Sequence, residues 1–220
     1  MRTRNVPEAK DEIQVIKYLD VAEMTITGSG KVNDNAFYAA KEIVLTITSK
    51  RPEILSQLSG YEFVLVAPGE SVTEAIGWDE RTSKLSGLAL TPQGYLGFPG
   101  RFASVIQKRK KPNMETFVHE FAHAIHAVVA KMDPEFDPSL NRAYNAAMKR
   151  GLWADKYFSQ DNWKREFSPV REYWADGVRM WYYVGVGKEF ETRDTFKKYD
   201  PGLTHLFGLW LSEEDIPIGY

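Results

Sequence analysis

The stretch Thr116-Phe117-Val118-His119-Glu120-Phe121-Ala122-His123-Ala124-Ile125-His126 places two histidines four residues apart in an apolar run. Residues i and i+4 of a helix stand on one face, so His119 and His123 can bind one metal ion together. Glu120 follows the first histidine, where it can act as general base toward a metal-bound water. The pattern H-E-x-x-H is therefore typical of zinc peptidases. The alternative is an amphipathic core helix with two hydrogen-bonded histidines.

A catalytic zinc site needs a third protein ligand beside a water molecule. The chain has four histidines, so only two others could serve. On a regular helix, His126 lies about 10 Å along the axis from His119, too far to share one tetrahedron. The glycine turn that leads to a third histidine in the metzincins is missing, since position 129 is valine. We therefore interpret His126 as a core residue or a neighbour of the site.

A better third ligand lies in the segment Pro169-Val170-Arg171-Glu172-Tyr173-Trp174-Ala175-Asp176-Gly177-Val178-Arg179-Met180-Trp181-Tyr182-Tyr183. Proline is well placed at the start of a helix, and Glu172 and Asp176 then share a face. This spacing suits a glutamate on the metal and an aspartate one turn on, hydrogen-bonded to a ligating histidine. The alternative is a helix whose polar stripe, Glu172, Asp176 and Arg179, faces water.

The two motifs His119-Glu120-Phe121-Ala122-His123 and Glu172-Tyr173-Trp174-Ala175-Asp176 resemble those of the gluzincin metallopeptidases. The most similar group includes the anthrax lethal factor catalytic domain, Pro-Pro endopeptidases and the Mlc titration factor. The resemblance covers the carboxyl-terminal half, including residues 140–153 and Tyr199-Asp200-Pro201. It implies that His119, His123 and Glu172 bind zinc, that Glu120 is the catalytic base and that Asp176 orients a ligand.

The same group uses a tyrosine shortly before the third-ligand glutamate to stabilise the oxyanion. At the expected offset this chain has Arg165, and the nearest upstream tyrosine is Tyr157. An insertion between Phe158 and Arg171 can account for the larger distance. We therefore favour Tyr157 as the catalytic donor, with Arg165 as the alternative.

Composition indicates a single domain, with 43% hydrophobic residues and a formal net charge of −2 over 220 residues. The absence of cysteine excludes thiolate ligands, so a metal must be held by nitrogen and oxygen. The near-neutral charge gives no reason to expect nucleic acid or a membrane as partner. We expect a peptide or protein substrate and a monomer. The first residues show no signal peptide, and both a cytoplasmic protein and a secreted mature form stay open.

Hydrophobic periodicity and turn residues predict the remaining elements. We expect a strand that includes Val21, Met24 and Ile26, and then a helix that is capped by Asn33 or Asp34 and runs to about Thr48. Further along the chain we expect a short helix over residues 52–58, a strand over 61–67, and helices over 138–150 and 203–211. Gly87-Leu88-Ala89-Leu90 is either a substrate-pairing strand or an ordinary edge strand. The basic run Lys108-Arg109-Lys110-Lys111 is interpreted as a solvated link.

These observations predict an α+β, zincin-like fold with a metal cleft between two lobes. Residues 1–111 would form an amino-terminal lobe on a small mixed sheet, and residues 112–220 a helical lobe with the two motif helices. The expected activity is zinc-dependent hydrolysis of peptide bonds. The alternatives are a metal-binding regulatory or partner-binding protein of the same fold without significant hydrolysis, and a structural domain without metal.

Overall fold

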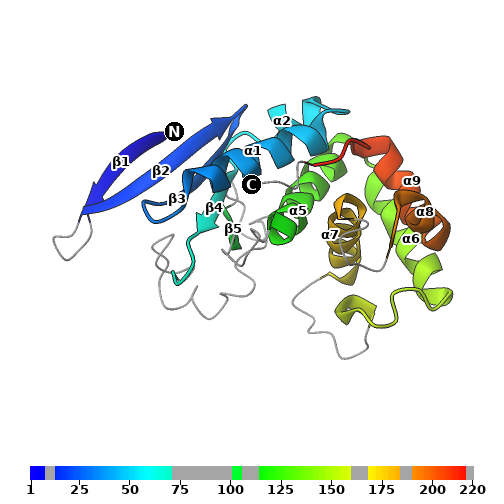
Figure 1. Cartoon of the computed structure of the whole chain (residues 1–220). Coiled ribbons are helices and arrows are strands. Elements are labelled where there is room, and N and C mark those ends of the chain that lie inside the picture. Colours follow the sequence, from blue (N-terminus) through cyan, green and yellow to red (C-terminus); the bar gives the residue numbers. More distant parts are fainter. Residues whose placement is uncertain (8–12, 71–100, 106–113, 160–167, 184–189, 217–220) are drawn as a thin grey trace.

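The computed structural model of the chain describes residues 1–7, 13–70, 101–105, 114–159, 168–183 and 190–216. The residues between these ranges, among them 87–90, 108–111 and Arg165, lie outside that description. The described part is α+β, with a mixed sheet beside a group of helices (Figure 1). The α+β class and the small mixed sheet are thus confirmed.

Within the described residues, five strands form the sheet in the order β1-β2-β3-β4-β5. The strands β1 (Arg2–Pro7), β2 (Ile13–Val21) and β3 (Met24–Ser29) are antiparallel neighbours. The strands β4 (Glu62–Val66) and β5 (Arg101–Val105) continue the sheet parallel to β3. The parallel connection from β3 to β4 passes through α1 (Asp34–Thr48) and α2 (Glu53–Ser56). Both helices lie where the sequence predicted them.

The prediction of one early strand was incomplete, because β2 and β3 form a hairpin in which Val21 pairs with Met24. Its turn is Ala22 and Glu23, and Ala22 has a φ of 50°. A positive φ is uncommon for alanine, and this pair is not among the usual turn dipeptides. The sequence therefore contains no signal for the turn.

The helix α5 (Met114–Met132) carries the H-E-x-x-H motif and contacts β5 and α1 on one side and α7 (Pro169–Tyr182) on the other. Phe117 and Phe121 pack against Phe63 of β4, with ring centroids 5.5 and 5.6 Å apart. Positions two apart on a helix point roughly 200° away from each other. Anchoring these phenylalanines on the sheet therefore turns His119 and His123 toward α7.

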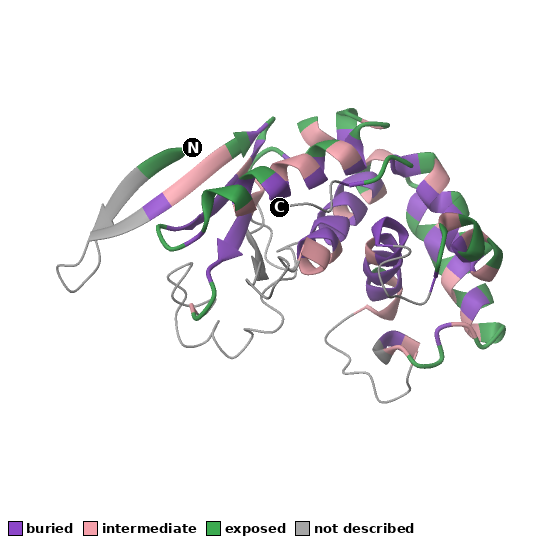
Figure 2. Ribbon diagram, in the orientation of Figure 1, coloured by how far each residue is buried: buried purple, intermediate pink, exposed green. Residues whose placement is uncertain are grey.

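The remaining helices are α6 (Phe136–Lys149), the 3₁₀ turn η2 (Tyr157–Ser159), α8 (Arg193–Tyr199) and α9 (Pro201–Trp210). Helices α6 and α9 each begin two residues before the predicted positions, and α8 was not predicted. Figure 2 shows that α7 is buried along most of its length. The indole Nε1 of Trp174 donates to the carbonyl of Ala122, 2.9 Å away, which joins α7 to the backbone of α5.

Tryptophans contribute to the core of the described part of the chain. Those buried are Trp153, Trp174, Trp181 and Trp210, whereas Trp78 and Trp163 lie outside the described residues. None of the described helices has the length and apolar character that crossing a bilayer requires.

Candidate metal centre

His119, His123 and Glu172 lie close enough together to hold one metal ion, each offering one ligand atom within 4.8 Å of the others. The two histidines come from α5 and the glutamate from the first turn of α7. The two histidine rings meet edge to face, with centroids 4.9 Å apart. The predicted ligand set is therefore brought together by the packing of two helices that are far apart in the sequence.

Distances between the ligand atoms agree with what a metal of zinc's size requires. His119 Nε2 lies 3.2 Å from His123 Nε2 and 3.3 Å from Glu172 Oε2, and His123 Nε2 lies 3.6 Å from Glu172 Oε1. Two atoms bound at about 2.0–2.2 Å in a tetrahedron lie about 3.4 Å apart. The donor set, two imidazole nitrogens and a carboxylate, is also one that zinc accepts. The residues present therefore fit a zinc ion.

Asp176 contacts Nδ1, the second ring nitrogen of His119, which is where a residue that orients a metal-binding histidine would lie. Its Oδ1 lies 3.2 Å from His119 Nδ1, and its side chain is 6% exposed. Burial disfavours the ionised carboxyl, but the hydrogen bond with His119 and the charge of Arg179 lower the pKa of Asp176 below its ordinary value. An ionised Asp176 accepts a hydrogen bond from Nδ1–H, which keeps a proton on Nδ1 and makes Nε2 the nitrogen that would bind a metal.

The two histidines have opposite proton affinities in the protein alone. Burial lowers the pKa of His119, yet hydrogen bonds to Asp176 and Glu172 outweigh burial and raise it to about 10. Burial and the charge of His119 lower the pKa of His123 to about 3. A metal ion must therefore displace a proton from this pair when it binds.

Glu120 lies on α5 between the two histidines, and its residue is 7% exposed. Burial raises its pKa to about 8; the charge of His119 opposes the rise, and the charges of Glu172 and Asp176 add to it. A carboxyl group with a pKa near neutrality can both accept and release a proton under ordinary conditions. Such a group suits the role predicted for Glu120.

His126 belongs to a different contact, which agrees with its interpretation as a core residue. Its Nε2 lies 2.9 Å from Asp137 Oδ1, and its ring meets Phe136 edge to face. Burial lowers the pKa of His126 to about 4, against the attraction of the Asp137 charge. His126 thus joins α5 to the start of α6.

Neither candidate for the oxyanion donor is tested by the structure. Tyr157 begins η2, which contacts α7, but its side chain lies outside the described part of the chain. Arg165 lies outside it altogether. The choice between them stays a prediction.

Two residues of the centre had no role in the sequence prediction. Arg179 was considered only as part of a solvent-facing stripe, yet its Nε donates to Asp176 at 3.0 Å and its Nη1 to Glu115 at 3.1 Å. Glu115 precedes His119 by four residues and Arg179 follows Asp176 by three, so helical spacing could have indicated both.

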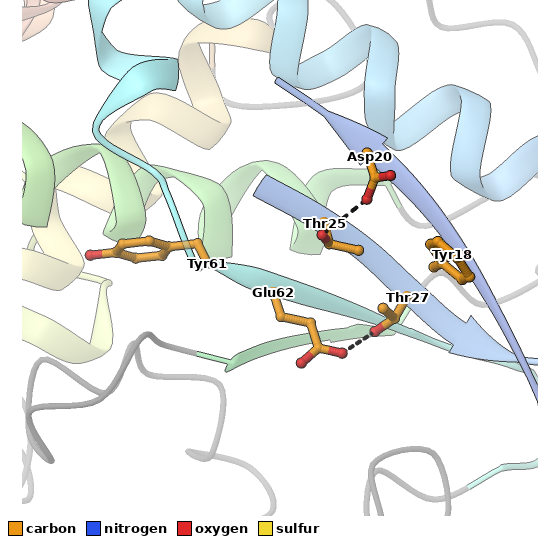
Figure 3. A pocket seen from close by; sticks show the side chains of 7 residues that line it. Tyr18, Asp20, Thr25, Thr27, Tyr61 and Glu62 are labelled. Atoms are coloured by element: carbon orange, nitrogen blue, oxygen red, sulfur yellow. Dashed lines mark hydrogen bonds between the residues drawn. The ribbon is translucent and has the colours of Figure 1, made fainter. Parts of the chain in front are cut away.

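A separate hollow of about 410 Å³ lies on the sheet and contains none of these residues (Figure 3). Its lining is Tyr18, Asp20, Thr25, Thr27, Gly60, Tyr61 and Glu62. Within it, Thr25 donates to Asp20 at 3.2 Å and Thr27 to Glu62 at 2.9 Å. These bonds join β2, β3 and β4 across their polar face.

The chain matches no protein-family model, no curated protein and no solved structure. The interpretation of the centre therefore depends on its own residues and geometry.

Proposed function

We propose that this protein is a zinc-dependent peptidase of the gluzincin type. The observation that carries the proposal is the convergence of His119, His123 and Glu172 on one point, with Glu120 beside them on α5. Three protein ligands are the usual number at a catalytic zinc, because a fourth position must stay open to water or substrate. A structural zinc site would more commonly have four protein ligands.

When bound, zinc supplies a Lewis acid that polarises a carbonyl and acidifies water. The chain's own residues supply the proton transfers. Glu120 takes a proton from the attacking water and delivers it to the leaving amine. Asp176 holds the Nδ1 proton of His119, so that the ring keeps the orientation and tautomer that a ligand needs. The substrate class is a peptide or protein.

The oxyanion donor in this proposal is Tyr157, with Arg165 as the alternative. A donor at the developing negative charge contributes roughly 10²–10³ in rate. Tyr157→Phe should therefore lose about two orders of magnitude in kcat while keeping its zinc. A large loss confined to Arg165→Ala would assign the role to the arginine.

The decisive experiment compares the zinc-loaded parent with Glu120→Gln on a mixed peptide library, with cleavage read by mass spectrometry. Loss of general-base catalysis should lower turnover about 10²–10⁴-fold. Zinc content, measured in parallel, should be unchanged, because Glu120 is not a ligand.

Two results would contradict the proposal. Equal cleavage by both proteins would exclude Glu120 as the base. A parent that holds zinc but cleaves nothing in the library would favour the alternative, a metal-binding regulatory or partner-binding protein.

A further inference from the structure

The polar residues of α5 and α7 meet in pairs along one seam between the helices. Residues 172 to 179 of α7 contact α5 in the reverse order, from residue 123 to residue 115. The two helices are therefore antiparallel. The pairs in order are Glu172 with His123, Asp176 with His119, and Arg179 with Glu115. The seam therefore extends one pair beyond the candidate metal ligands.

A single oxygen atom joins the last pair to the metal centre. Asp176 Oδ1 lies 3.2 Å from His119 Nδ1 and accepts a second hydrogen bond from Arg179 Nε at 3.0 Å. The same guanidinium donates through Nη1 to Glu115 Oε2 at 3.1 Å. The Arg179 side chain is 21% exposed, so this contact is largely shielded from water.

We propose that Arg179 is a positioning residue for the metal centre, acting through Asp176 on His119. The inference rests on the proposed zinc site but not on peptidase activity. A histidine that binds zinc is neutral, so it cannot balance the charge of the buried Asp176 carboxylate. Arg179 supplies the balancing positive charge and holds the carboxylate in the orientation in which it accepts a hydrogen bond from Nδ1–H of His119.

The shape of the arginine side chain is essential to this role. A guanidinium presents donors in a rigid planar fork, whereas lysine presents a point charge on a flexible stem. Arg179 uses separate nitrogens for Asp176 and Glu115, and so ties α7 to the first turn of α5. A lysine at this position would keep the charge but lose the fixed geometry.

The test measures zinc affinity by competition with a chelator of known affinity in the parent, Arg179→Gln, Asp176→Asn and the double variant. Loss of an outer partner of a zinc ligand commonly costs about 10–100-fold in affinity. We expect Asp176→Asn to fall in that range and Arg179→Gln to lose roughly tenfold. Because Arg179 acts through Asp176, the double variant should bind zinc about as well as Asp176→Asn alone.

Matched variants separate positioning from a general effect on folding. Arg142→Gln removes an exposed arginine on α6 and should leave zinc affinity unchanged. Arg179→Lys keeps the positive charge and should lose affinity by less than Arg179→Gln. Circular dichroism of the metal-free proteins will show whether Arg179→Gln folds. If it does not, Arg179→Lys takes its place in the comparison of the single and double variants.

The outcomes distinguish this inference from the proposed function. If the parent binds zinc and Arg179→Gln binds it equally well, or if the losses simply add in the double variant, Arg179 does not act through Asp176. If the affinities behave as expected but no peptide is cleaved, the positioning role stands and the peptidase proposal fails. A parent that binds no zinc overturns both.

Discussion

Asp200 is a buried carboxylate on which three separate segments of the helical part depend, and its removal should be severely destabilising. It is 2% exposed. Its Oδ2 accepts from Trp153 Nε1 at 2.8 Å and from the Tyr173 hydroxyl at 2.7 Å, and its Oδ1 accepts from the backbone of Leu203 at 3.1 Å. Burial and the charge of Asp200 raise the pKa of Tyr173, so the phenol stays a donor.

The cost of Asp200→Ala follows from these bonds. Two buried donors, Trp153 Nε1 and the Tyr173 hydroxyl, would lose their acceptor at about 1–3 kcal/mol each. Loss of the N-cap of α9 adds about 1 kcal/mol. We therefore expect a loss of about 5 kcal/mol, within a range of about 3–7 kcal/mol, which is a large share of a typical stability of about 5–15 kcal/mol.

Two milder variants test the same bonds. An asparagine has one acceptor oxygen, so Asp200→Asn can serve either the two side-chain donors or the backbone of Leu203. The amide NH₂ of the asparagine then faces the donors that its oxygen does not serve. Tyr173→Phe removes one donor to a charged acceptor, at a cost of about 1.5–3 kcal/mol. Both should be less harmful than Asp200→Ala.

The assay is urea denaturation of the metal-free proteins, so that bound metal does not add to stability. The chain has no cysteine, and oxidation of thiols therefore cannot interfere. A free energy of unfolding of Asp200→Ala within about 1 kcal/mol of the parent would refute the reasoning, since that is the value of one ordinary hydrogen bond. If Asp200→Ala does not fold, Tyr173→Phe decides, and an unchanged stability there would refute it equally.

Three further predictions concern the centre and the helix that carries its third ligand. Metal analysis of His123→Ala and Glu172→Ala should show loss of zinc beside a loaded parent, and full occupancy in both would exclude this ligand set. Zinc affinity should rise with pH by up to about tenfold per unit below pH 10, because hydrogen bonds to Asp176 and Glu172 raise the pKa of His119 to about 10 and the metal must displace the proton that this histidine then holds; calorimetry in buffers of different ionisation enthalpy counts that proton, and no release would contradict the pKa. In Gly177→Ala, the new Cβ would lie 2.4 Å from Leu203 Cδ2; overpacking at about 1–3 kcal/mol outweighs the helix-propensity gain of about 1 kcal/mol, so a more stable variant in urea would contradict the packing of α9 on α7.

The sequence alone determined the helix that carries the motif and the chemistry that it presents. The spacing of His119 and His123 specifies one helical face, because that geometry is local and depends only on the 3.6-residue period. Pro169 marked the start of the next motif helix, and the spacing of Glu172 and Asp176 placed both carboxylates on one side of it. These predictions required no knowledge of how the helices pack.

Elements without a local pattern could not be predicted. The turn at Ala22 lacks the residues that usually mark a hairpin, and β1 pairs with β2 without an alternating pattern of its own. Asp200 directly precedes Pro201, the first residue of α9, so its sequence position suggests only a role as helix cap. Its two side-chain partners, Trp153 and Tyr173, are distant in the sequence and meet it only in the folded chain.

Only the tertiary structure decided which residues of the two motif helices face each other. Phe63 of β4 packs on Phe117 and Phe121 and so turns the histidines toward α7. The antiparallel register then sets Glu172 beside both histidines and Arg179 beside Glu115. Helical periodicity specifies a face but not its partner, because the register depends on side-chain packing along the whole length of both helices.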